Sequence, residues 1–221
     1  MGELKNKRLA LLRQADLYVV ITEEFTAGRG SVRVLEEAAD AGIRIVQLRE
    51  KHLSGKELFH RAEQFRRICD RYNILMIMND HLDIALMCGA DGVHLGQDDL
   101  PLEESVQFAP DLIIGRSTHS REEALEAQSR GASYINLGPI FPTQTKNTPV
   151  HPLGIEIIRQ TRGDLKIPFS VMGGIKSHHI PNLLEEGARL IAMVTEVTQA
   201  PDIGKRIRDL RALWNCRVQP K

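Results

Sequence analysis

Eight short apolar segments, separated by longer amphipathic ones, dominate the pattern of this chain. They begin at Leu17, Arg44, Ile74, Gly92, Leu112, Tyr134, Pro168 and Leu190. Each is hydrophobic on both faces, which is typical of a parallel strand that is covered on both sides of its sheet. Eight strands that alternate with helices predict an α/β fold, the closed (β/α)₈ or TIM barrel.

The amphipathic segments between these strands carry helix signals. Residues 55–72 place Leu58, Ala62, Phe65 and Cys69 on one face. Ser120, with Glu123 three residues later, predicts a capping box at the start of another helix. An extra helix, about residues 3–14, precedes the first strand and is expected to cover the bottom of the barrel.

The chain is therefore predicted to be a single TIM-barrel domain over residues 1–221, with an N-terminal helical extension over residues 1–15. The alternative is an open, doubly wound sheet, which requires a glycine-rich fingerprint after the first strand. The segment that follows the first strand, TEEFTAGRGS, lacks the GxGxxG spacing of that fingerprint.

Composition restricts the partners of the chain. The 29 basic and 29 acidic residues give a net charge of zero, so no overall field favours nucleic acid or an anionic membrane. Three cysteines without a CxxC motif favour reduced thiols in a cytoplasmic protein. No signal peptide and no apolar run of about 20 residues is recognised. We expect a cytoplasmic protein with small-molecule substrates, and homo-oligomerisation is left open.

In a (β/α)₈ barrel the chemistry lies at the carboxyl ends of the strands. After the second strand, Gln47, Arg49 and Lys51 alternate toward one side, where two cations and an amide are suited to bind an anion. Asn79 and Asp80 follow the third strand, and Asp99 follows the fourth. Two carboxylates at one end of adjacent strands predict a Mg²⁺ site if the substrate carries a diphosphate.

The later strands end in groups that are suited to phosphate. Ser117 and His119 follow the fifth strand, and a proline-rich loop after the sixth carries hydroxyls and an ammonium group. A Gly-Gly pair follows the seventh strand, where the backbone can approach a ligand closely. The residues concerned in these last segments are Thr143, Thr145, Lys146, Gly173, Gly174, Val194 and Thr195.

With these residues assembled, the sequence resembles the thiamine phosphate synthase family over nearly its whole length. The matching motifs, in order, are QLREK from Gln47, ND at Asn79, ADGVHLGQDD from Ala90, GRSTHS from Gly115, LGPIFPTQTK from Leu137 and GGI from Gly173. The resemblance implies a transferase that condenses 4-amino-2-methyl-5-(diphosphooxymethyl)pyrimidine with a thiazole phosphate. The products are thiamine phosphate and pyrophosphate, with CO₂ if the thiazole is carboxylated.

The resemblance also implies a role for each matching residue. Gln47 would contact the pyrimidine, and Asp80 and Asp99 would hold Mg²⁺. The diphosphate would be bound by Arg49, Lys51, Asn79, Ser117 and Lys146, of which Arg49, Lys51, Ser117 and Lys146 are the predicted catalytic residues. The thiazole phosphate would be bound by Thr143, Thr145, Gly174, Val194 and Thr195.

One departure concerns the thiazole phosphate site. The family usually has Ser where this chain has Thr195, and the extra methyl group restricts rotation about χ1. Glu196 follows directly and is expected to bring a negative charge near the bound phosphate. These two residues leave open a barrel that binds thiazole phosphate without catalysis.

Two further alternatives share the fold. A thiazole tautomerase would isomerise a thiazole carboxylate phosphate without pyrophosphate chemistry, and His119 could serve it as a base. An unrelated phosphate-binding barrel isomerase of sugar or indole metabolism would need a Lys or Glu base at a strand end. Glu50 is the candidate there, and strand alternation predicts that it points away from the mouth.

Overall fold

The computed structural model describes residues 2–143, 145 and 151–215. Their strands form a closed barrel in which neighbours in sequence are neighbours in space, from β1 round to β8. All eight pairings are parallel. The strands are β1 (Leu17–Ile21), β2 (Ile45–Leu48), β3 (Leu75–Asn79), β4 (Gly92–Leu95), β5 (Ile113–Thr118), β6 (Tyr134–Leu137), β7 (Phe169–Val171) and β8 (Leu190–Met193). The predicted barrel is confirmed.

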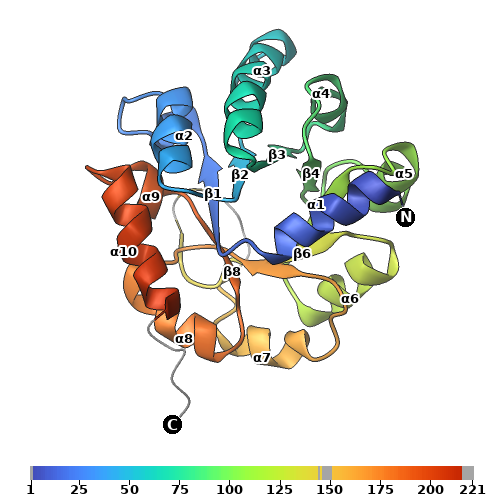
Figure 1. Ribbon diagram of the computed structural model, residues 1–221. Helices are drawn as coiled ribbons and strands as arrows, with labels where there is room; N and C mark the ends of the chain where they lie inside the picture. Colours follow the sequence, from blue (N-terminus) through green and yellow to red (C-terminus); the bar gives the residue numbers. More distant parts are fainter. Residues whose placement is uncertain (1, 144, 146–150, 216–221) are drawn as a thin grey trace.

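A ring of helices surrounds the strands (Figure 1). It consists of α2 (Ser31–Asp40), α3 (Gly55–Tyr72), α4 (Leu82–Met87), α5 (Leu102–Phe108), α6 (Arg121–Ser129), α7 (Glu156–Arg162), α8 (Ile180–Glu185), α9 (Thr195–Thr198) and α10 (Ile203–Asn215), with 3₁₀ turns η1 (Glu23–Phe25) and η2 (Ser177–His179). Successive parallel strands have to be joined by long crossover connections, and these helices form them.

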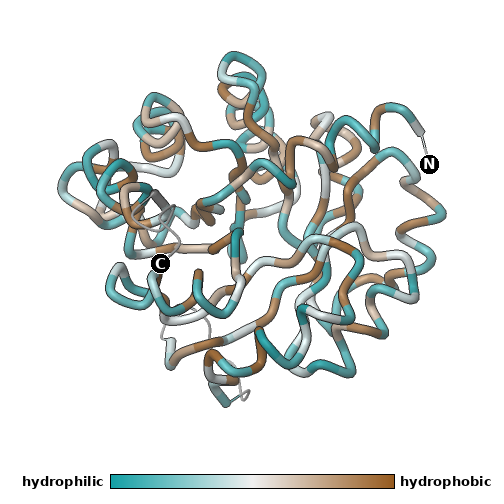
Figure 2. Tube along the Cα trace, turned by 60° about the horizontal axis from the view of Figure 1, so that its bottom comes forward, coloured by the Kyte–Doolittle hydropathy of each residue, from teal (hydrophilic) through white to brown (hydrophobic). Residues whose placement is uncertain are grey.

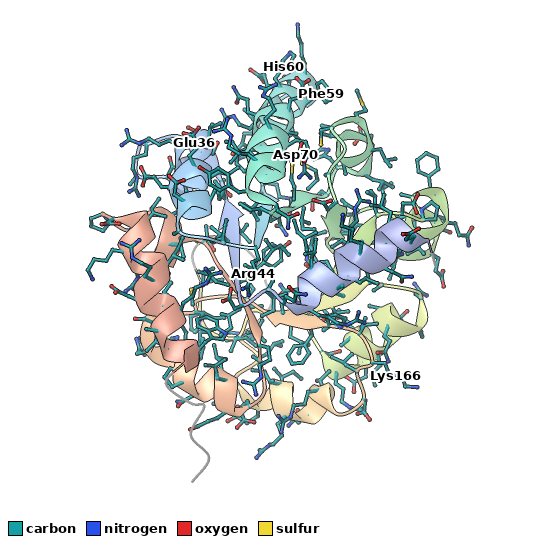
Figure 3. All side chains as sticks on the ribbon, viewed as in Figure 1. Glu36, Arg44, Phe59, His60, Asp70 and Lys166 are labelled. Carbon is teal, nitrogen blue, oxygen red and sulfur yellow. The ribbon has the colours of Figure 1, made fainter. Side chains whose placement is uncertain are left out.

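Hydrophobic segments alternate with hydrophilic ones along the chain (Figure 2). The larger core cluster lies between the strands and the outer helices. On α3 it takes in Leu58, Ala62, Phe65 and Cys69, which are the four residues predicted to share a face. Polar side chains such as Glu36, His60 and Lys166 extend from the outer surface (Figure 3).

The additional helix α1 (Glu3–Arg13) lies across one end of the barrel (Figure 1). Its Leu9 and Leu12 are buried and belong to a second core cluster with barrel residues such as Tyr18, Ile77 and Tyr134. The helix therefore closes the amino-terminal end of the barrel, and the opposite end is left for ligands. Among the described residues, no helix is both long and apolar enough to cross a membrane.

The start of α6 differs in detail from the prediction. Ser120 is its N-cap, and the hydroxyl accepts a hydrogen bond from the backbone N–H of Glu123 at 3.1 Å. The carboxylate of Glu123 accepts from the N–H of His119 at 2.8 Å. The predicted capping box is therefore half formed. A complete capping box begins α3, where Ser54 and Glu57 bond reciprocally.

Candidate active site

Three of the predicted side chains meet beside the ends of β2, β3 and β4. Lys51 forms an ion pair with Asp80. Asp80 in turn lies within hydrogen-bonding reach of the carboxyl group of Asp99. Asp99 is held by the backbone N–H of Gly96, which donates to its Oδ2 at 2.6 Å. The loop after β4 thus fixes one carboxyl group beside the other.

The two carboxyl groups differ in acidity. Burial raises the pKa of Asp99, and the neighbouring Asp80 raises it further. Burial also opposes ionisation of Asp80, but hydrogen bonds from Asp99 and Lys51 hold the pKa of Asp80 below its usual value. Two ionised carboxylates within hydrogen-bonding reach repel each other unless a proton or a cation lies between them. The pair is therefore suited to a divalent cation.

The backbone at Asp80 is in a conformation that a non-glycine residue rarely adopts. Its φ angle is +62°, in the left-handed region. Such conformations cost roughly 1–3 kcal/mol and persist where the surrounding structure fixes them. The N–H of Asp80 donates to the carbonyl of His94 at 2.9 Å, which joins this residue to the end of β4.

Asn79 and Gln47 are buried at the ends of their strands. The side-chain Nδ2 of Asn79 is buried and has no hydrogen-bond partner among the described residues. An unsatisfied buried donor is costly, and a ligand oxygen would satisfy it. Arg49 follows β2, where Asp80 and Glu50 are among the carboxylates that act on its guanidinium group.

The other predicted residues line two adjoining cavities over β5 to β8. Ser117, His119, Thr143 and Thr145 contribute to the first, of about 80 Å³. The second, of about 40 Å³, is lined by Thr143, Thr145, Gly174, Val194 and Thr195, together with neighbouring residues. The hydroxyl oxygens of Thr143 and Thr145 are 3.0 Å apart. The two threonines therefore form a shared wall between the cavities.

Gly174 could not be replaced without disturbing the second cavity. Its φ angle is +62°. A Cβ at this position would lie 2.2 Å from the carbonyl oxygen of Pro142, far inside van der Waals contact. The loop after β6 therefore packs directly against the backbone of the loop after β7.

Glu196 lines the second cavity, and its negative charge is paired there. Its carboxylate forms ion pairs with Lys176 and Arg206 and accepts a hydrogen bond from the N–H of Ser177 at 3.1 Å. Burial works against ionisation of this group, but these partners hold the pKa of Glu196 below its usual value. The expected negative charge near the phosphate is thus compensated by two cations.

Two candidate bases are engaged in structural contacts. Glu50 is buried, and its Oε1 accepts a hydrogen bond from the N–H of Glu23 at 2.8 Å. It therefore supports the loop after β1, as expected for a residue that points away from the mouth. His119 contacts the carbonyl of Gly138 through Nδ1. This contact orients the imidazole ring at the edge of the first cavity.

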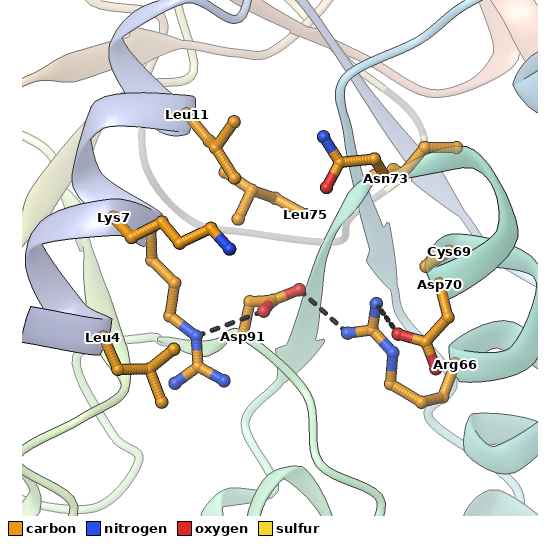
Figure 4. A pocket seen from close by; sticks show the side chains of 11 residues that line it. Leu4, Lys7, Leu11, Arg66, Cys69, Asp70, Asn73, Leu75 and Asp91 are labelled. Atoms are coloured by element: carbon orange, nitrogen blue, oxygen red, sulfur yellow. Dashed lines mark hydrogen bonds and ion pairs between the residues drawn. The ribbon is translucent and has the colours of Figure 1, made fainter.

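A further polar pocket, of about 150 Å³, lies at the other end of the barrel (Figure 4). Asp91 accepts hydrogen bonds there from Arg8 of α1 at 3.1 Å and from Arg66 of α3 at 2.8 Å. The same carboxylate accepts from the N–H of Met76 at 2.9 Å. These contacts attach α1 and α3 to the barrel. The charged groups of Arg8, Arg66 and Asp91 are paired with one another in this way.

Of the predicted site residues, all but Lys146 lie within the described part of the chain. Those residues are brought to the carboxyl ends of the strands as two groups, one around Asp80 and Asp99 and one around Thr143 and Thr145. Three polar residues inside the barrel were not predicted from the sequence: Tyr18, His94 and Tyr134. Their strand positions looked like core, and inward alternation was the one signal that could have identified them.

Comparisons with known proteins identify the family of this chain. A family model described as thiamine monophosphate synthase matches residues 17–197. The chain belongs to this family. It is 42% identical over 207 residues to a thiamine-phosphate synthase of Dictyoglomus turgidum, covering 93% of each chain. It is 46% identical over 188 residues to that of Shouchella clausii, covering 85% of this chain and 90% of the relative.

A solved structure leads to the same family. Thiamine phosphate pyrophosphorylase from Pyrococcus furiosus superimposes with a TM-score of 0.86 at 33% identity, over 97% of this chain and 100% of the other. The family predicted from the sequence is confirmed, and so is the predicted function, thiamine-phosphate synthesis by a transferase. The tautomerase and the non-catalytic barrel are not favoured.

Proposed function

We propose that this chain condenses 4-amino-2-methyl-5-(diphosphooxymethyl)pyrimidine with a thiazole phosphate, and that the residues described above divide the two substrates between them. The observation that carries the proposal is the meeting of Lys51, Asp80 and Asp99 at the same barrel end as the threonine-lined cavities. A diphosphate and a monophosphate need two separate anion sites, and the mouth offers two.

The diphosphate belongs at the first group. Arg49 and Lys51 supply positive charge, and the unsatisfied Nδ2 of Asn79 supplies a buried donor. Ser117 adds a hydroxyl at the edge of the neighbouring cavity. Lys146, the remaining predicted contact, lies outside the described residues. Arginine and lysine at such a site stabilise the charge that develops on a departing pyrophosphate.

Asp80 and Asp99 would hold Mg²⁺. In the described part of the chain, no group of three or more His, Cys, Asp or Glu side chains is arranged to hold a metal. A pair of carboxylates nevertheless suits Mg²⁺, because this ion commonly takes one or two carboxylates and completes its shell with water and phosphate oxygens. When bound there, the ion would neutralise charge on the leaving pyrophosphate.

The thiazole phosphate belongs at the second group. Thr143 and Thr145 present hydroxyls from one loop, and Gly174, Val194 and Thr195 bring backbone close to the second cavity. Because Lys176 and Arg206 compensate the charge of Glu196, that residue does not prevent phosphate binding. Thr195 keeps the hydroxyl that the family usually has at this position.

The chemistry is a dissociative displacement. The C–O bond to pyrophosphate breaks as the aminopyrimidine delocalises the positive charge that forms at its methylene carbon. The thiazole nitrogen, held next to that carbon, then donates its lone pair and forms the new C–N bond. No general base is required, because the nitrogen carries no proton. Binding both rings at one mouth supplies a gain from orientation.

The test is to incubate the purified chain with both heterocycles and Mg²⁺ and to measure thiamine phosphate and pyrophosphate. We expect the two products in equal amounts, and we expect EDTA to stop the reaction. Absence of thiamine phosphate under these conditions would overturn the proposal. Full activity in EDTA would remove the metal role of Asp80 and Asp99 while leaving the condensation itself intact.

A further inference from the structure

A chain of hydrogen bonds crosses the inside of the barrel beneath the mouth. The Nε2 of Gln47 donates to the hydroxyl of Tyr18 at 2.8 Å, and that hydroxyl lies 3.1 Å from the hydroxyl of Tyr134. Tyr134 lies 3.0 Å from Nδ1 of His94, whose Nε2 lies 2.9 Å from the hydroxyl of Ser117. These hydrogen bonds link five strands, and the two ends of the series are Gln47 and Ser117, both residues of the proposed active site.

The surroundings hold this chain together. Tyr18 and Tyr134 are 1% and 0% exposed, and His94 is 6% exposed. Gly115 makes room for them, because a Cβ there would lie 2.2 Å from the ring of Tyr134 and 2.5 Å from His94. Burial raises the pKa of Tyr18 and of Tyr134, so both phenols keep their hydrogen atoms.

For a neutral imidazole at His94, the hydrogen atoms of such a chain can be arranged in two complete ways. If Gln47 donates through Nε2, then Tyr18 donates to Tyr134, which donates to Nδ1 of His94. The neutral imidazole then donates from Nε2 to Ser117. In the reverse arrangement the Gln47 amide is turned, its oxygen accepts from Tyr18, and every other donor and acceptor is exchanged.

The two arrangements differ at both ends. With Gln47 donating to Tyr18, as in the structure, its amide oxygen has no partner among the described residues and is available to accept from a ligand. The hydroxyl of Ser117 accepts from His94, so its own hydrogen is available to an anion. In the reverse arrangement Gln47 offers N–H to the ligand, and Ser117 offers only lone pairs.

We propose that this chain of hydrogen bonds couples the choice of pyrimidine substituent at Gln47 to the donor state of Ser117, and that Tyr18, Tyr134 and His94 are positioning residues for specificity. The proposal rests on the proposed function, in which Gln47 contacts the pyrimidine and Ser117 the diphosphate. A 4-amino group is a donor and matches the arrangement in which Ser117 donates to the diphosphate.

A 4-oxo pyrimidine would be disfavoured at both ends of this series of hydrogen bonds, at Gln47 and at Ser117. Its carbonyl at C4 is an acceptor, so Gln47 has to turn and present Nε2. The turn reverses the chain and leaves the lone pairs of Ser117 facing the anionic diphosphate oxygens. The discrimination therefore includes the loss of a hydrogen bond to a charged group, remote from the position where the two compounds differ.

The experiment compares the 4-amino and 4-oxo pyrimidine diphosphates in Tyr134→Phe, which keeps the ring but removes the central hydroxyl and its hydrogen bonds to Tyr18 and His94. Dissociation constants for both compounds are measured by calorimetry without thiazole phosphate. We expect the preference for the amino compound to fall by about tenfold, or roughly 1.4 kcal/mol, because each end can then turn independently.

Two more variants make the test specific. Tyr18→Phe removes the hydroxyl that contacts Gln47 and Tyr134 and should reduce the preference for the amino compound by a similar factor. The double variant should lose no more of this preference than either single variant. Tyr72→Phe removes the hydroxyl of an exposed tyrosine that contacts Asp40 on the outer surface, and it should leave the preference unchanged.

An unchanged preference in Tyr134→Phe and Tyr18→Phe, with a wild type that forms thiamine phosphate, would overturn the coupling and leave the proposed function standing. Additive losses in the double variant would also overturn it, because they would mean two separate effects. A wild type that binds neither pyrimidine diphosphate and forms no product would remove the proposed function, and the coupling with it.

Discussion

Several single residues at the barrel mouth have a strained backbone, a buried polar group or a close charge. Such features persist only because the surrounding structure holds these residues in place. Asp80 is the clearest example, since it keeps a left-handed backbone and contacts both a cation and a second carboxyl group. Asn79 beside it buries an unsatisfied donor. The left-handed backbone and the unpaired donor both cost folding free energy, and a ligand that bonds to Nδ2 of Asn79 would remove the second of these costs.

Arg49 is the residue whose removal tests the diphosphate site most directly. We expect Arg49→Ala to lower kcat by about 10²–10³-fold, because a positive charge near the leaving group is lost. Thermal unfolding should show that the fold is retained. Arg33→Ala, which removes an exposed arginine paired with Glu37 on α2, is the matched control and should keep normal turnover. Near-normal turnover in Arg49→Ala would contradict the assignment.

Most candidate residues could be predicted because chemistry in this fold gathers at strand ends, and the strands were visible as apolar runs. Asp80, Asp99 and Thr143 were found in this way. Tyr18 and Tyr134 were not, because an aromatic residue inside a strand looks the same whether its hydroxyl is idle or bonded. Besides each other, their partners are Gln47 on β2 and His94 on β4, and only the closed barrel brings these four strands together.

At the scale of elements, the eight strands begin within one residue of the predicted positions. Helices α4 and α7 were missed, because six or seven residues are too few to show a clear helical period. The pairing of Glu196 could not be foreseen either. Lys176 precedes η2 and Arg206 belongs to α10, so both partners depend on how these elements pack around α9.

This three-way link has a consequence for stability. We expect Glu196→Gln to lower the free energy of unfolding at neutral pH by about 1–2 kcal/mol, since the ion pairs with Lys176 and Arg206 would be lost. The pKa of Glu196 is held below its ordinary value of 4.5 in the folded protein. Its stabilisation is therefore complete above that pH and disappears as the pH falls through the lower, folded-state value.

Urea unfolding of both forms between pH 3 and pH 8 is the measurement, with these limits set by the ordinary range of carboxyl pKa values. The difference between wild type and variant should be constant above about pH 5 and shrink toward acid. A difference that grew as the pH fell would contradict the ion pairs seen in the structure. Lys205 and Asp209 form an exposed pair on α10, and Asp209→Asn serves as the control.

At the scale of the whole molecule, α1 acts as a cover for the barrel. Leu12 is 1% exposed and packs into the barrel's inner core, whereas Leu4 on the same helix is 47% exposed. We expect Leu12→Ala to lower the free energy of unfolding by about 2–4 kcal/mol through loss of packing and a residual cavity. Leu4→Ala should change it by less than about 0.5 kcal/mol.

Calorimetric or urea unfolding distinguishes these outcomes, and the kinetics at the mouth should be unaffected in both variants at temperatures where they are folded. Equal effects of the two substitutions would mean that α1 is not an integral part of the core. The network around Asp91, which joins α1 to α3, adds a polar attachment to this apolar one.

Because α1 covers one end and side chains fill the interior, the described residues leave the barrel one open end, at the carboxyl ends of the strands. Two reactants must enter and two products must leave through it. A product that dissociates slowly from this end delays binding of the next two substrates, so product release contributes to the turnover rate. By closing one end of the barrel, α1 thereby makes the turnover rate depend on the order in which the products leave at the other end.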